Sequence, residues 1–84
     1  MTKRSRFEIY IDVLRSIKNG KNRITPIMYQ SNLSYKPTRE ILDFLTEKEL
    51  VVTRRRGNST LYEITPKGLN VLNYFEKTKQ LIFL

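Results

Sequence analysis

Two groups of cationic side chains carry most of the chemistry that this sequence offers. Lys36 and Arg39 are three positions apart, and Arg54, Arg55 and Arg56 begin fifteen positions later. A guanidinium presents a fork of N–H donors that matches a phosphate or the O6 and N7 edge of guanine, and an ammonium binds phosphate as a point charge. The two groups predict contact with a nucleic acid, provided that the fold places them on one side of the molecule.

The side chains that most enzymes use for acid–base and nucleophilic chemistry are missing. The sequence contains no cysteine and no histidine, which excludes Ser–His and Cys–His nucleophiles, thiolate metal sites and disulfides. A zinc ion would have only carboxylates as ligands, which is an unusual donor set. We predict that the chain is not an enzyme and takes no metal or other cofactor, and no small-molecule site is evident.

Positive charge is concentrated in two parts of the chain. The sequence has 16 Lys and Arg against 8 Asp and Glu, for a net charge of +8. Residues 1–39 carry +7 and residues 54–84 carry +4, whereas residues 40–53 carry −3. This pattern indicates an anionic partner, nucleic acid first and an acidic membrane or protein second. The alternative, a generally basic protein of a thermophile, would mix the signs more evenly.

Neither a membrane span nor an export signal is expected. No apolar run approaches the ~20 residues that cross a bilayer. The chain starts with basic residues, but Glu8 and Asp12 interrupt the apolar segment that a signal peptide would need. We expect a cytoplasmic protein on the nucleoid, with no membrane partner.

Two helices are predicted in the first third of the chain. A capping box begins at Ser5, apolar residues then recur at helical spacing, and an Asn-Gly pair follows, so the first helix spans about 6–18. Thr25-Pro26 marks the start of a short second helix at about 26–31. Ile24, just before it, either forms a short strand or packs against the core.

A third helix is predicted to carry the first cationic group. Ser34 is its N-cap, Pro37 falls in the first turn, where no N–H is needed, and the helix runs to about Lys48. The stripe expected to face the core consists of Ile41, Leu42 and Leu45. The charged residues that then face outward are Lys36, Arg39, Glu40 and Asp43.

A hairpin and a final helix follow. Segments 50–54 and 60–64 are rich in β-branched residues and are predicted to pair across the turn residues 57–59, which puts the arginine triplet near the tip. Because side chains alternate along a strand, we expect two of the three arginines to share the side that faces DNA. Thr65-Pro66 repeats the cap-and-proline pattern and begins a helix that runs nearly to the end.

This order of elements defines the expected fold. Three helices followed by a two-stranded hairpin form a winged helix-turn-helix, an α+β fold that is mainly α. We predict one domain, residues 1–84, with a winged-helix core at 5–65 and a C-terminal dimerisation helix at 66–84. Five aromatic residues have core spacing and are expected to be buried rather than to stack on single-stranded bases; they are Tyr10, Tyr29, Phe44, Tyr62 and Phe75.

The sequence resembles a known family over nearly its whole length. The run Asn32-Leu33-Ser34-Tyr35-Lys36, spaced from Thr65-Pro66-Lys67-Gly68, is similar to that of small archaeal winged-helix DNA-binding regulators, close to the archaeal ten-kilodalton "a" DNA-binding proteins. The resemblance implies DNA binding without catalysis and dimerisation through the C-terminal helix.

Two positions depart from that family. Glu49 stands where a glycine usually closes the third helix, so Glu49 must accept strain of about 1 kcal/mol or the helix must end in another way. Thr38 stands where the family has a large aliphatic residue, so we expect looser packing near the start of the third helix.

The residues predicted to contact DNA lie around the third helix and on the wing. The N-terminal part of such a helix meets base edges in the major groove, and a wing grips phosphates or the minor groove. The predicted contacts are Arg23, Ser34, Tyr35, Lys36, Thr38, Arg39, Arg54, Arg55, Arg56 and Asn58. Further phosphate contacts are expected from Arg4, Arg6, Arg15, Lys18 and Lys21. The alternatives are a plain solvated helix face and a strand edge kept soluble by charge.

The apolar end of the final helix calls for a covering surface. A homodimer through this helix would place two copies of the third helix about one duplex turn, ~34 Å, apart. The residues predicted at the dimer interface are Leu69, Leu72, Phe75, Ile82 and Phe83. The alternatives are packing of this helix on the first helix, and fraying.

Together these features predict a sequence-specific double-stranded DNA-binding protein that acts as a dimeric transcriptional regulator. Two alternatives stay open: a winged-helix module that binds an acidic protein, and an architectural protein that coats DNA without sequence preference. The sequence indicates neither the operator nor an effector.

Overall fold

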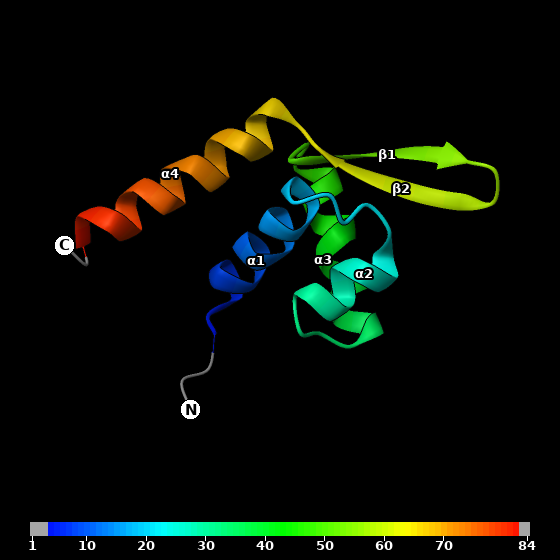
Figure 1. Cartoon of the computed structure of the whole chain (residues 1–84), viewed down its shortest axis with the longest axis horizontal. Helices are drawn as coiled ribbons and strands as arrows, with labels where there is room; N and C mark the ends of the chain where they lie inside the picture. Colours follow the sequence, from blue (N-terminus) through cyan, green and yellow to red (C-terminus); the bar gives the residue numbers. More distant parts are fainter. Residues whose placement is uncertain (1–3, 83–84) are drawn as a thin grey trace.

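Four helices and a two-stranded antiparallel sheet make up the computed structural model, which describes residues 4–82 (Figure 1). The elements in chain order are α1 (Arg6–Lys18), α2 (Ile24–Gln30), α3 (Tyr35–Glu47), β1 (Val51–Arg56), β2 (Ser59–Ile64) and α4 (Pro66–Ile82). This arrangement is the predicted winged helix-turn-helix, with β1 and β2 as the wing. None of the described helices is both long enough and apolar enough to span a bilayer.

Local signals fix both ends of α1. The Glu8 backbone N–H donates to Ser5 Oγ at 3.1 Å, and the Ser5 N–H donates to Glu8 Oε1 at 3.1 Å, which completes the predicted capping box. Asn19 is the C-cap, and Gly20 has a φ of +99°, which a residue with a Cβ rarely adopts. The predicted bounds of this helix are confirmed.

The predicted start of α2 is wrong by two residues. The helix begins at Ile24, with Arg23 rather than Thr25 as its N-cap, and no side chain accepts a hydrogen bond from its first turn. Pro26 is then the third residue of the helix, where its missing N–H still costs nothing. Ile24 therefore belongs to a helix and not to a strand.

The wing is a tight hairpin with a two-residue loop. Arg56 pairs with Ser59, which leaves only Gly57 and Asn58 between the strands, and Gly57 takes a φ of +62°. The outer edge of β2 is partly covered, because the Tyr62 N–H donates to the carbonyl of Asn22 at 2.8 Å.

One buried cluster joins all six elements. Its fully or almost fully buried members are Ile11, Val13, Leu14, Ile17, Ile27, Leu42, Leu45, Val51, Tyr62 and Leu72. Tyr10 stacks on Phe44 at the border of this cluster, with 4.9 Å between ring centroids. The burial expected for the aromatics is complete for Tyr62 and partial for Tyr10, Phe44 and Phe75, but it is wrong for Tyr29, which is 75% exposed.

The end of α3 and the start of α4 are joined by the Thr65-Pro66-Lys67-Gly68 segment. Thr65 Oγ1 donates to the Glu49 carbonyl at 2.7 Å and accepts from the Gly68 N–H at 3.0 Å. Lys67 Nζ donates to the Lys48 carbonyl at 3.0 Å, close to the negative end of α3. Of the two possibilities for Glu49, the structure shows the strained one, because its φ is +62°.

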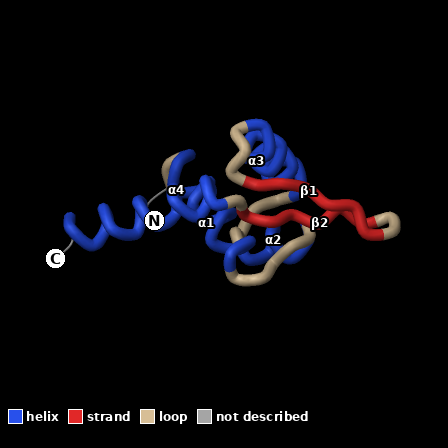
Figure 2. The backbone as a smooth tube through the Cα atoms, turned by 90° about the horizontal axis from the view of Figure 1, so that it is seen from above, coloured by secondary structure: helices blue, strands red, loops and turns tan. Residues whose placement is uncertain are grey.

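The wing and the last turns of α4 lie at opposite ends of the molecule. Figures 1 and 2 both show the hairpin projecting from one end and α4 running past α1 toward the other. The principal extents are 46, 30 and 20 Å. α3 begins beside α2, and its other end leads into β1 at the base of the wing (Figure 1).

Candidate nucleic-acid interface

The first turn of α3 is not covered by the rest of the described chain. Ser34 is its N-cap, although the Ser34 side chain accepts no capping hydrogen bond, and Ser34, Lys36 and Pro37 are exposed. Tyr35 is 56% exposed. A helix with an uncovered first turn can enter a groove, which is the geometric condition that the DNA prediction requires.

Thr38 does not meet that condition. Its side chain is fully buried, and its hydroxyl donates to the Ser34 carbonyl at 2.8 Å. The prediction that Thr38 contacts DNA is wrong, because residue 38 falls on the same side of α3 as the buried Leu42 and Leu45. A helix period that places Leu42 and Leu45 inside also places residue 38 inside.

Arg39 is exposed and pairs with Asp43, with 3.4 Å between Arg39 Nε and Asp43 Oδ1. Asp43 raises the pKa of the Arg39 guanidinium above its ordinary value, so Arg39 is cationic at any physiological pH. Because both side chains are more than half exposed, the pair is weak and can open to admit another acceptor.

Arg39 also borders a cavity of about 250 Å³ between α2, α3 and the wing. The residues that line this cavity are Arg23, Ile24, Thr25, Arg39, Ser59, Thr60 and Tyr62. Two arginines and four residues with hydroxyl groups, from three elements, therefore line one cavity. The Tyr62 hydroxyl, like that of an ordinary tyrosine, is protonated at neutral pH and can donate a hydrogen bond, and burial raises its pKa further. A phosphate would suit this combination of donors.

The arginine triplet divides between the two faces of the wing. Cross-strand partners share a face, so Arg55 and Thr60 continue the face that carries the buried Val51 and Tyr62. Arg54 points to the other face and pairs with Glu63, with 3.2 Å between Arg54 Nη2 and Glu63 Oε2.

Alternation places Arg55 on the face that carries Thr60 and Tyr62, two of the residues that line the Arg39 cavity. Arg56, opposite Ser59, shares the face of Arg54. All three arginines and Asn58 are exposed, and contact of these residues with DNA stays a prediction.

Tyr29 is the exposed aromatic that the sequence reasoning missed. It lies one helical turn beyond Thr25, which lines the cavity, so both residues lie along the same side of α2. The signal was present in the sequence: with Ile24 and Ile27 facing inward on a helix of seven residues, position 29 has to face outward.

The predicted dimer surface on α4 is only partly available. Leu72 is 1% exposed and packs in the core of its own chain, so its assignment to an interface is wrong. Leu69 and Phe75 are half-buried, and the Phe75 ring meets the Phe7 ring edge-on at 5.5 Å. Ile82 ends the helix, but its side chain lies outside the described part, as does the whole of Phe83.

Tyr74 and Leu81 form the exposed apolar surface of α4, at 76% and 74%. The cavity between α2, α3 and the wing and this surface lie on different elements. Within residues 4–82 we find no group of three acidic side chains that could hold a metal ion.

The winged helix-turn-helix family model matches residues 3–83. The chain belongs to the winged helix-turn-helix family. Two proteins from Methanocaldococcus jannaschii are similar to this chain in sequence. They are the uncharacterized protein MJ0290, 32% identical over 96% of this chain, and the uncharacterized protein MJ0287, 33% identical over 79% of it. The chain covers 36% of the first relative's length and 64% of the second's.

Solved structures share the fold. Sso10a-2, a DNA-binding protein from Sulfolobus solfataricus, superposes with a TM-score of 0.82 at 25% identity, covering 93% of this chain and 81% of that one. The transcriptional regulator BldR from the same organism superposes at 0.74 with 22% identity, covering 88% and 56%, and shares the fold. The family model, the archaeal relatives and Sso10a-2 confirm the resemblance to archaeal winged-helix DNA-binding regulators. The family agrees with the prediction that the chain is not an enzyme.

Proposed function

We propose that this winged helix-turn-helix protein binds double-stranded DNA sequence-specifically and acts as a transcriptional regulator. The observation that carries the proposal is the cavity lined by Arg23, Arg39 and the hydroxyl-bearing residues of β2, together with the exposed first turn of α3. A duplex suits this surface, because its anionic backbone borders a groove that admits a helix. A role on DNA would locate the protein on the nucleoid.

In this proposal α3 enters the major groove with its first two turns. Arg39 leaves Asp43 and binds guanine O6 and N7, which is worth about 1–3 kcal/mol of discrimination against another base. Lys36 and Tyr35 bind the adjacent backbone or base edges. Arg23 holds a phosphate at the start of α2, and Arg55 follows the backbone or the minor groove.

We further propose that the protein acts as a homodimer through the outer part of α4. The exposed Tyr74 and Leu81 support this, because they are large apolar side chains that the chain itself leaves uncovered. Two-fold symmetry would call for a palindromic site with half-sites about one duplex turn, ~34 Å, apart.

Selection of binding sites from random duplexes tests the proposal directly. A sequence-specific regulator yields one enriched, palindromic site, and binding to that site falls with added salt. If a dimer neutralises ~6–10 phosphates, the plot of log affinity against log salt has a slope of about −5 to −9. A slope near −1 would contradict the electrostatic part of the proposal.

Two other functions predict different outcomes. An architectural protein would bind a selected site and random duplex equally well. A module for an acidic protein would ignore DNA and retain an acidic partner. The selection experiment favours regulation only when a selected site outcompetes random duplex by about 10³-fold or more.

A further inference from the structure

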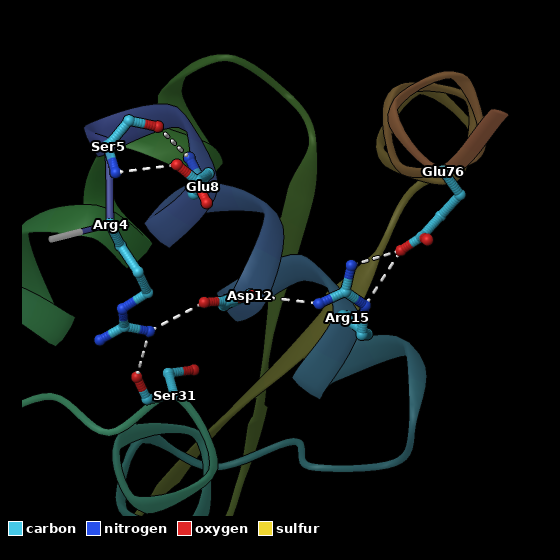
Figure 3. Close-up of polar contacts among 7 residues, drawn as sticks. All are labelled: Arg4, Ser5, Glu8, Asp12, Arg15, Ser31 and Glu76. Atoms are coloured by element: carbon cyan, nitrogen blue, oxygen red, sulfur yellow. Dashed lines mark hydrogen bonds and ion pairs between the residues drawn. The ribbon is translucent and has the colours of Figure 1, made fainter. Parts of the chain in front are cut away.

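Four charged side chains form a continuous row from α4 to the turn between α2 and α3 (Figure 3). Glu76 on α4 pairs with the guanidinium of Arg15 on α1, with Arg15 Nε at 3.1 Å from Glu76 Oε1. Arg15 Nη1 contacts Asp12 Oδ1 at 3.0 Å, and Asp12 Oδ2 accepts from Arg4 Nη1 at 2.8 Å. Arg4 and Arg15, which were predicted to contact phosphates, are both engaged within the protein.

Arg4, the last member of the row, forms hydrogen bonds with the backbone at the end of α2. Arg4 Nη1 donates to the Ser31 carbonyl at 2.8 Å, and Arg4 Nη2 donates to the Asn32 carbonyl at 3.2 Å. These carbonyls follow the last helical residues, where no N–H of the helix reaches them. A cation is favourable at this end of a helix, and the fork of a guanidinium can hold two acceptors at once.

The two carbonyls belong to the turn that sets the direction of α3. Asn32 has a φ of +56°, and the chain enters α3 only two residues later, at Ser34. A rotation at this turn would swing the first turn of α3, the part that we propose enters the groove. Each side chain of the row is partly shielded, with exposures between 29% and 43%, so its ion pairs are stronger than those of a fully exposed surface.

We propose that Arg4 is a positioning residue for α3, and that Asp12, Arg15 and Glu76 make its position depend on α4. The inference rests on the proposed function, because it assigns to α4 an influence on how α3 meets DNA. In a dimer the row would link the helix that joins the subunits to the turn that aims the recognition helix.

Hydrogen exchange tests this link without DNA. Glu76→Gln removes the charge at the far end of the row and keeps the shape of the side chain. We expect the amides of Asn32 and Leu33, which donate within the turn, to exchange about fivefold faster or more, with the Tyr62 amide unchanged. Glu63→Gln, which removes the exposed Arg54 pair, is the matched control and should leave the turn unchanged.

DNA binding tests the role of Arg4 itself. Arg4→Lys keeps the positive charge but cannot hold two carbonyls and Asp12 in the same geometry. We expect Arg4→Lys to lose about tenfold in affinity for the selected site, with an unchanged salt slope, because no phosphate contact is lost.

The outcomes separate this inference from the proposed function. Wild-type affinity for Arg4→Lys, together with a salt slope flatter by about 1 for Arg4→Gln, would make Arg4 a simple phosphate contact and overturn the inference. Unchanged turn exchange in Glu76→Gln, or equal acceleration at Tyr62, would also overturn it. Failure of the wild-type protein to bind any duplex would overturn the proposed function, while the exchange data would still decide whether the row positions the turn.

Discussion

At Glu49 the backbone adopts a conformation that favours glycine. The positive φ of Glu49 ends α3 and lets the chain turn at Leu50 into β1. The Glu49 side chain itself is exposed. The strain therefore comes from the Cβ atom and not from a crowded surrounding. A residue without Cβ should relieve it.

Glu49→Gly is expected to raise the free energy of unfolding by about 0.5–1 kcal/mol, because the relief of strain exceeds the added freedom of glycine in the unfolded chain. Urea unfolding followed by circular dichroism measures the change. Glu49→Ala is the control, since it removes the same charge but keeps Cβ. Equal stabilisation by both variants would assign the effect to charge.

Arg39 and Arg55 should differ in the kind of binding that they support. Arg39→Ala is expected to weaken the selected site by about 1–3 kcal/mol and to leave random duplex nearly unaffected, because a base contact is lost. Arg55→Ala should weaken all duplexes alike and flatten the salt slope by about 1. Fluorescence anisotropy at several salt concentrations measures both, and an interchange of the two results would show that the wing reads bases.

Tyr29 offers a test of the α2 surface. Tyr29→Phe removes one hydroxyl from a side chain that is already exposed, so stability should change by less than about 0.5 kcal/mol. If α2 borders the DNA backbone, the affinity for duplex falls about threefold to tenfold through loss of a phosphate hydrogen bond. Tyr74→Phe removes the hydroxyl of an equally exposed tyrosine on α4 and should leave affinity unchanged.

Single residues explain where sequence reasoning about the site succeeded. The outward direction of Lys36 and Arg39 followed from the apolar stripe of α3, and the structure confirms it. The prediction that Thr38 contacts DNA failed because threonine is a polar residue and was expected at the surface. In the structure its hydroxyl donates to the carbonyl four residues earlier, and its methyl group is buried. The Arg4 contact could not be predicted, because it joins positions 27 residues apart.

Elements with strong end signals were predictable, and those without them were not. The capping box and the Asn-Gly stop fixed α1, and the alternating β-branched segments gave β1 and β2 to within two residues. The start of α2 has no side-chain cap, so Thr25-Pro26 was a misleading signal. Tertiary packing of Ile24 decides where that helix begins.

Close contacts constrain the junction of α3, β1 and α4. A Cβ on Gly68 would overlap the Leu50 carbonyl oxygen and lie 2.8 Å from Ile64 Cγ1. The same carbonyl accepts the Thr65 N–H at 3.1 Å, so it cannot move away without loss of that bond. This contact gives the glycine of the Thr-Pro-Lys-Gly segment a physical reason.

Gly68→Ala is expected to destabilise the protein by about 2–3 kcal/mol, although alanine is the better helix former, because α4 must shift from the base of the wing. Thermal unfolding measures the loss. Asn70→Ala, at an exposed position of the same helix, should be neutral or slightly stabilising. If the Gly68→Ala protein were as stable as the Asn70→Ala protein, the backbone at this junction would be able to shift and accommodate a Cβ at position 68 without loss of stability.

The whole molecule separates two surfaces along its long axis. α3 and the wing carry Lys36, Arg39 and the arginine triplet, and α4 carries the exposed Tyr74 and Leu81. The sequence predicted the cationic helix and wing from their charge, and the dimer surface from the apolar C-terminal segment. It could not predict which apolar positions of α4 are already used, because Leu72 fills the core of its own chain.

Leu81→Asp is expected to convert a dimer to a monomer, because an unpaired carboxylate would be buried in the interface. Sedimentation equilibrium at micromolar concentration measures the mass. Asn70→Asp adds the same charge at an exposed position near the start of α4 and should leave the mass unchanged. A wild-type protein that sediments as a monomer at all concentrations would contradict the proposed dimer.

The burial of Leu72 has a consequence for how such a regulator would respond to its own abundance. The first half of α4 packs against its own subunit, so only a short part of the helix is available for contact with a second copy. A dimer interface this small dissociates on dilution. Occupancy of an operator would then rise with the square of the protein level at low abundance. Promoter control would switch over a narrower range of expression than a permanent dimer allows, and closely related subunits would be free to exchange partners.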